Sequence, residues 1–128
     1  MALLVELIRV AFCFPLTLVL FGFWAWILIS TARKNANRNC RFLLGCFTTF
    51  ISPFGLLLFS VMFANFGSEA LATLVPLAAF GFHVALSTYL VKLWPTAISA
   101  IIASAVMSGY MLLAAAFVSV QAIQGDWL

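Results

Sequence analysis

Apolar residues run through this chain in four long blocks, and polar or charged residues gather mainly between them. The blocks are residues 10–31, 42–66, 70–91 and 97–120. Each block is long enough to cross a bilayer as a helix, because about 20 residues span about 30 Å of hydrocarbon. None of them alternates polar and apolar residues, as the strands of a membrane barrel would. We therefore predict an all-α integral membrane protein with four transmembrane helices, arranged as antiparallel hairpins in a single domain, residues 1–128.

The composition excludes a soluble fold. Hydrophobic residues make up 66% of the sequence and charged residues 7%, against about half and about a quarter in soluble domains. Residues 1–9 place Glu6 and Arg9 opposite several leucines, which predicts a short amphipathic lead at the membrane interface. The first block is longer than the apolar part of a signal peptide and ends in a basic flank. We therefore interpret it as a true span.

The basic residues predict how the chain is oriented. Five of the six lie in the first and third connectors: Arg33, Lys34, Arg38, Arg41 and Lys92. By the positive-inside rule these connectors are cytoplasmic, which places both termini outside the cytoplasm. The acidic residues Glu6, Glu69 and Asp126 fall on the outer side, and Arg9 is the one exception. We expect an N-out, C-out protein of a bacterial inner (plasma) membrane.

The loop of residues 32–41 is the one clearly hydrophilic stretch of the sequence. Each basic residue close to an anionic membrane surface contributes about 1 kcal/mol of attraction. We expect the four basic residues of this loop to rest on anionic lipid headgroups. A docking site for an acidic partner is the alternative.

The second and third connectors are short and carry turn chemistry. In residues 65–69, Gly67 suits a left-handed helix end, Ser68 a cap, and Glu69 the positive first turn of the next helix. In the third connector, Pro95 either ends one helix or begins the next. Both connectors therefore predict helices that pack side by side.

Each of the first three blocks contains one proline: Pro15, Pro53 and Pro76. A proline inside a helix removes a backbone hydrogen bond and tends to kink the helix, and nearby hydroxyls can satisfy the freed carbonyl. Thr48 and Thr49 lie close before Pro53 and are candidates for that role. We predict kinks that shape packing, with a hinge in a transport cycle as the alternative.

The fourth block is rich in small residues, and the second is rich in large ones. Helical spacing relates Ala97, Ala100, Ser104 and Ser108, which we call the small-residue stripe, and Ala105 with Gly109 forms a pair beside it. Small residues let helices approach closely in lipid, where no hydrophobic effect drives association. We predict a packing face that meets either the other three helices or a foreign subunit. The second block holds seven phenylalanines, and we expect the surplus rings to face lipid or a partner.

The other aromatic residues divide by depth in the predicted spans. Tyr89, Trp94 and Trp127 lie where interfacial anchors are expected. Trp24 and Trp26 lie deeper in the first block. For these two we predict a role in the core or in an interface rather than in ligand stacking.

His83 is the single histidine and falls near the middle of the third block. An ionisable side chain at that depth is a candidate functional residue, as a haem ligand, a proton carrier or part of a quinone site. A haem with two histidine ligands would need the second from another subunit. We expect no cofactor and a neutral His83 that bonds to a hydroxyl such as that of Tyr110 or Ser108.

Residues for catalysis or metal binding are missing from the sequence pattern. Cys13, Cys40 and Cys46 lack the spacing of a metal site, and we expect three free thiols. All three carboxylates fall at or beyond the ends of the blocks, which argues against an ion-coupled transporter made by this chain alone. We find no catalytic set, no phosphate-binding loop and no nucleic-acid face. We expect a protein that is not an enzyme.

These observations favour a small non-enzymatic membrane protein that acts by helix–helix interaction with another membrane protein. It would be an accessory subunit of a membrane complex or an inhibitor of the immunity type. One alternative is an oligomeric small transporter or channel protomer. The other is a haem- or quinone-binding membrane anchor of a redox complex that uses His83. No motif in the sequence selects a family.

Overall fold

The computed structural model describes residues 5, 15–35 and 40–125. These residues form helices and turns, with no strand among them. The helices are α2 (Pro15–Lys34), α3 (Arg41–Thr48), α4 (Ile51–Met62), α5 (Glu69–Leu93), the short 3-10 helix η1 (Pro95–Ala97) and α6 (Ile98–Gln124). The all-helical prediction is confirmed for this part of the chain. Several residues named above lie outside it: Glu6, Arg9, Cys13, Arg38, Asp126 and Trp127.

Four stretches are long and apolar enough to cross a membrane: Leu16–Lys34, Arg41–Met62, Glu69–Leu93 and Pro95–Gln124. They correspond to the four predicted blocks, with shifted ends. The second stretch ends at Met62 rather than at residue 66, because the chain turns there. The third continues to Leu93, so Lys92 lies in the last turn of α5 and not in the connector, which corrects the prediction.

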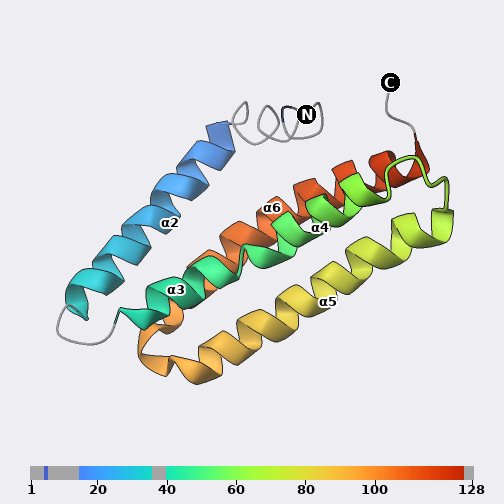
Figure 1. The fold of residues 1–128 in the computed structure, drawn as a ribbon. Coiled ribbons are helices and arrows are strands. Elements are labelled where there is room, and N and C mark those ends of the chain that lie inside the picture. Colours follow the sequence, from blue (N-terminus) through green and yellow to red (C-terminus); the bar gives the residue numbers. More distant parts are fainter. Residues whose placement is uncertain (1–4, 6–14, 36–39, 126–128) are drawn as a thin grey trace.

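The longest helix, α6, lies at the centre of the structure and contacts α2, α3, α4 and α5. Figure 1 shows α2 and α5 on opposite sides of α6, with α3 and α4 running along it. The most extensive contacts join α6 to α5 and to α4, whereas α2 packs chiefly against α6. The block rich in small residues therefore forms the central helix, which has close neighbours on several sides.

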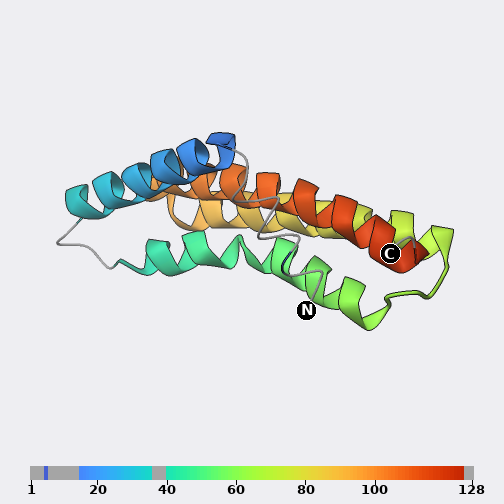
Figure 2. The same cartoon turned by 90° about the horizontal axis from the view of Figure 1, so that it is seen from above.

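The second span is broken between α3 and α4, as Figure 2 shows. Pro53 has no N–H to donate to the carbonyl of Thr49, so the helix ends at Thr48 and begins again at Ile51. Thr49 Oγ1 instead donates to the carbonyl of Cys46 at 2.7 Å. A kink was predicted at Pro53, and the structure has a full break in the helix just before it, whereas Pro76 lies inside an uninterrupted α5.

The turn of residues 63–68 ties α4 and α5 to the end of α6. The N–H groups of Asn65 and Gly67 donate to the carbonyls of Ala122 and Ile123, both at 2.9 Å. Asn65 and Gly67 have φ values of 62° and 69°, the left-handed region predicted for Gly67. Ser68 caps α5 as expected, accepting a hydrogen bond from the N–H of Leu71. The last carbonyls of α6 are thereby satisfied within the chain.

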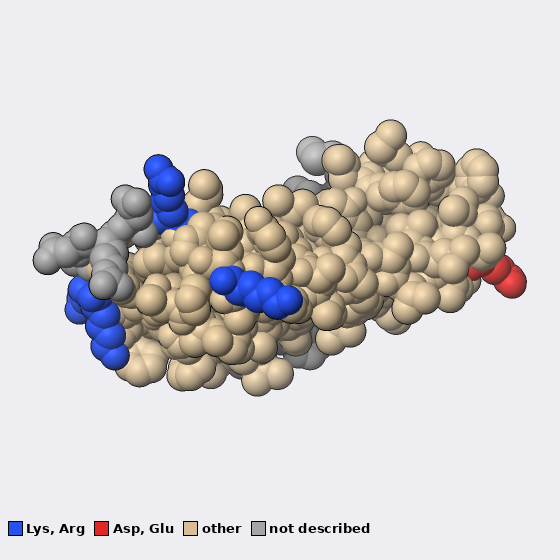
Figure 3. All heavy atoms as spheres, turned by 90° about the horizontal axis from the view of Figure 1, so that it is seen from below, with Lys and Arg blue, Asp and Glu red and all other residues tan. Residues whose placement is uncertain are grey.

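Charge separates along the length of the molecule. Arg33 and Lys34 end α2, Arg41 begins α3 and Lys92 lies in the last turn of α5, and these helix ends meet at the same end of the structure. Glu69, in the first turn of α5, lies at the opposite end. In Figure 3 the described basic side chains lie in one half of the molecule, and the described acidic side chain lies at the opposite end.

Candidate functional site

The small-residue stripe of α6 is covered by the chain's own helices. Ala97, Ala100, Ser104 and Ser108 are each at most 1% exposed. Ala105 and Gly109, beside the stripe, are half-buried and face α5. The stripe is thus a packing face inside the molecule, and a partner protein would have to bind elsewhere on the surface.

Ser104 is the point where three parts of the chain meet. The indole Nε1–H of Trp24, from α2, donates to Ser104 Oγ at 2.8 Å. The hydroxyl of Thr49, at the break between α3 and α4, lies 3.4 Å from the carbonyl of Ser104. Ser108 Oγ donates to that same carbonyl at 2.7 Å. A buried indole N–H requires a partner, and the serine hydroxyl supplies it.

His83 links α5 to α6 and to α4. Its Nε2 lies 3.0 Å from the carbonyl oxygen of Ala105, and its Nδ1 lies 3.2 Å from Ser52 Oγ. A carbonyl can only accept, so Nε2 carries the proton, and in the neutral ring Nδ1 accepts from Ser52. The expected hydroxyl partner is therefore Ser52, rather than Tyr110 or Ser108.

Gly109 makes room for this histidine. A Cβ added at Gly109 would lie 3.4 Å from His83 Nε2, which is the tight limit of ordinary contact. The small residue beside the stripe thus lets the imidazole reach the backbone of α6. A cofactor iron would need one of the two nitrogens, and both are engaged within the bundle. Cofactor binding at His83 stays a prediction that would require one of these contacts to break.

Two further hydroxyl pairs extend the polar contacts along α6. Ser60 Oγ of α4 lies 2.6 Å from Ser119 Oγ, and Thr17 Oγ1 of α2 lies 3.2 Å from the hydroxyl of Tyr110. Among the buried polar side-chain atoms that the structure describes, only Ser87 Oγ has no hydrogen-bond partner. The same residues contain no group of three metal-ligating side chains. The buried polar groups are therefore arranged to hold helices together.

The tryptophans fall into different surroundings. Trp24 is buried, whereas Trp26, two residues later, is 65% exposed. Trp94, predicted as an interfacial anchor, is half-buried, and its ring packs directly on the backbone of Gly45. Tyr89 is exposed near the basic end, where an anchor is expected. Cys46 is buried in α3, and Cys40 is exposed.

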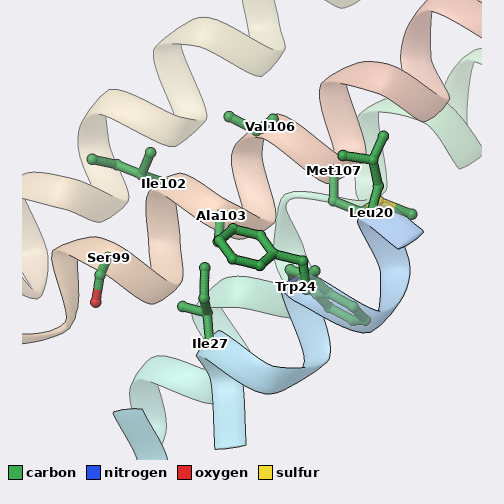
Figure 4. Close-up of a pocket in the computed structure, with 9 residues that line it drawn as sticks. Leu20, Trp24, Ile27, Ser99, Ile102, Ala103, Val106 and Met107 are labelled. Atoms are coloured by element: carbon green, nitrogen blue, oxygen red, sulfur yellow. The ribbon is translucent and has the colours of Figure 1, made fainter. Parts of the chain in front are cut away.

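Two grooves lie on either side of α2. The apolar groove lies between α2 and α6, has a volume of about 410 Å³ and is shown in Figure 4. The aromatic groove lies between α2 and α3–α4, has a volume of about 450 Å³ and is lined by Trp24, Phe47, Phe50, Ile51, Phe54 and Met111. These grooves are the hollow surfaces that the packing of α2 leaves open.

Sequence reasoning missed the partners of Trp24 and His83. One available signal was the helical spacing of Thr49, Ser52 and Ser60, which places three hydroxyls on the face of the second span that the structure buries. Hydroxyls in apolar spans commonly bond across helices, so that face could have been paired with the serines of the fourth block.

No protein-family model, curated protein or solved structure matches this chain. Its function must therefore be argued from its own contacts.

Proposed function

We propose that this chain is a non-enzymatic integral membrane protein that acts by binding another membrane protein, as an accessory subunit or an inhibitor of the immunity type. The observation that carries the proposal is the contrast between its interior and its surface. Most buried polar side chains of the bundle bond to one another or to backbone carbonyls, and the described residues contain no group of three metal-ligating side chains. The surface instead offers large exposed rings beside an open groove.

The aromatic groove is the proposed partner site. Phe47 and Phe54 are more than half exposed on one wall, and Trp24 forms the opposite wall from α2. Large aromatic side chains dominate contact energies, and close helix approach in lipid requires small residues on the facing helix. The fitting partner is a transmembrane helix of another protein with alanine, glycine or serine along its docking face.

The charge distribution supports the orientation that we propose for the chain in the membrane. The basic end of the bundle would face the cytoplasm of a bacterial inner membrane, with four helices inserted as antiparallel hairpins and both termini outside. A reporter that is active only in the cytoplasm should be silent when fused after Leu128 and active when inserted at Asn37. Cytoplasmic activity at the C-terminus would reject the N-out, C-out arrangement.

The partner itself is tested by purifying the chain from its native membrane in mild detergent and recording mass and visible absorbance. We expect a colourless heteromeric complex. Replacing both Phe47 and Phe54 by alanine should release the partner and leave a folded monomer, because both side chains are exposed. Alanine at both Leu74 and Leu77, which are exposed on α5, is the matched control and should keep the complex.

Two other results would overturn the proposal in favour of its alternatives. Recovery of a homo-oligomer without a second protein would favour a transporter or channel protomer. A Soret band in the visible spectrum would favour a haem-binding anchor that uses His83.

A further inference from the structure

The apolar groove adjoins a second hollow toward the basic end of the molecule. This second hollow has a volume of about 490 Å³, and we call it the polar hollow. Ile27 of α2 and Ser99 of α6 line both, so the two hollows adjoin, and we call them together the continuous site. The apolar part is lined by side chains such as Leu20, Phe23, Ile102 and Val106, as Figure 4 shows in part.

The polar hollow has the chemistry of an anion site. Lys34 supplies a positive charge, and Ser30, Thr96 and Ser99 supply hydroxyl groups. No acidic residue lines it among the described residues. An ammonium group with neighbouring hydroxyl donors suits a phosphate oxygen. Lys34 ends α2 at the end of the bundle where Arg33, Arg41 and Lys92 also lie.

We infer that the continuous site binds one phospholipid with an anionic headgroup, with its phosphate at Lys34 and an acyl chain in the apolar groove. From Ile27 to Leu20 the groove follows α2 over seven residues, about 10 Å at the rise of an α-helix. One leaflet of hydrocarbon is about 15 Å deep, half of the bilayer core. The groove is therefore long enough to hold the upper part of one acyl chain.

The chemistry of the polar hollow argues against a protein helix as the occupant of the continuous site. An apolar transmembrane helix in the groove would leave the exposed Lys34 without an anionic partner, whereas a lipid phosphate would pair with it. An anionic lipid matches both parts of the site at once. This lipid site is separate from the aromatic groove, so it can fail or stand independently of the proposed protein partner.

The test uses the full chain in mild detergent, titrated with phosphatidylglycerol or with phosphatidylcholine of the same acyl chains and followed by native mass spectrometry. We expect tighter binding of phosphatidylglycerol. Lys34→Gln should weaken phosphatidylglycerol binding about fivefold, the factor expected for one lysine at an anionic headgroup, and weaken phosphatidylcholine binding less, because the choline cation offsets the charge of its phosphate. Lys34 is exposed, so this variant should fold.

Lys92→Gln is the matched control, because it removes the same charge at the same end of the bundle but outside the polar hollow. It should leave the affinity for phosphatidylglycerol unchanged. An equal loss of affinity in both lysine variants would reduce the effect to general surface charge and overturn the site. Equal binding of the two lipids by the unaltered chain would also overturn it.

The groove is tested separately by Ala103→Phe, which places a ring in the apolar part. It should weaken the binding of both lipids, whereas Ala85→Phe on the exposed face of α5 should weaken neither. Unchanged lipid binding in folded Ala103→Phe would contradict acyl-chain binding there. Competition by inorganic phosphate as effective as that by the lipid would mark a phosphate site without a lipid chain and would likewise overturn the proposal. If Ala103→Phe does not fold, the two lysine variants decide the question.

Discussion

The helices on the two sides of α6 are held in different ways. α5 is connected to α6 by Trp94 and η1. The turn of residues 63–68, which precedes α5, bonds to the far end of α6, and His83 joins the middle of α5 to α6. α2 is held to α6 by apolar packing and by the side-chain contacts of Trp24 and Thr17. Grooves remain on both sides of α2. α5 has the more numerous ties to α6, and the more sparsely tied α2 borders both grooves proposed above as binding surfaces.

The largest expected effect comes from overfilling α6 where each flanking helix touches it, at Ser104 of the stripe and at Gly109 beside it. Ser104→Leu removes the acceptor of Trp24 and pushes α2 away, and Gly109→Leu pushes the ring of His83 away from Ala105. Each should lower the unfolding free energy of the monomer by about 3 kcal/mol, as expected when a tight core is overfilled. Denaturation of the purified chain in detergent measures this.

Ile102→Leu is the control for these variants, since Ile102 is half exposed on the same helix. Its unfolding free energy should match that of the unaltered chain. If Ser104→Leu and Gly109→Leu left the monomer intact while a co-purifying protein was lost, this face of α6 would be a partner interface instead.

A smaller effect is expected at the point where α3 meets the connector after α5. A methyl group at Gly45 would collide with the ring of Trp94, so Gly45→Ala should destabilise the monomer by about 2 kcal/mol. Gly55→Ala lies in the same span with nothing within 4 Å of the added carbon. Its stability should be unchanged or higher, because alanine favours a helix over glycine by about 1 kcal/mol. Equal stability of the two variants would show that Trp94 does not pack on Gly45.

The smallest effect is expected from loosening α5 without overfilling anything. His83→Leu removes the contacts with Ala105 and Ser52, and interhelical hydrogen bonds in membranes average about 0.6 kcal/mol each. The loss should therefore be about 1 kcal/mol, with normal abundance in the membrane. Comparing the activity of His83→Leu with that of the unaltered chain at equal abundance decides the role of His83. Loss of activity in the variant would make His83 a functional residue and would favour the proton or redox alternatives.

The sequence was sufficient to predict the four apolar spans of this fold. Block length predicted the spans, Pro53 predicted a kink where the structure has a break, and Gly67 with Ser68 predicted the turn before α5. These features depend on residues close together in the chain, where helix length, a missing N–H or a positive φ determines the outcome.

The pairing of helices could not be predicted in the same way. The hydrogen bond between Trp24 and Ser104 joins residues far apart in sequence, and the contact of Trp94 with Gly45 depends on the rotation of two helices about their axes. In lipid an apolar side chain gains little from facing a protein rather than the bilayer, so hydropathy does not indicate which face turns inward. The small residues of the fourth block indicated a packing face but not which helix covers it.

The most direct test of this account is a double-mutant cycle between Trp24 and Ser104 in the purified monomer. Trp24→Phe, Ser104→Ala and the double variant are unfolded in detergent, and their free energies are compared. If the stripe of α6 is covered by the chain's own α2, the two changes should be coupled by about 0.6 kcal/mol, the average for such bonds. Strictly additive effects, with no coupling, would contradict the internal packing of α2 on α6.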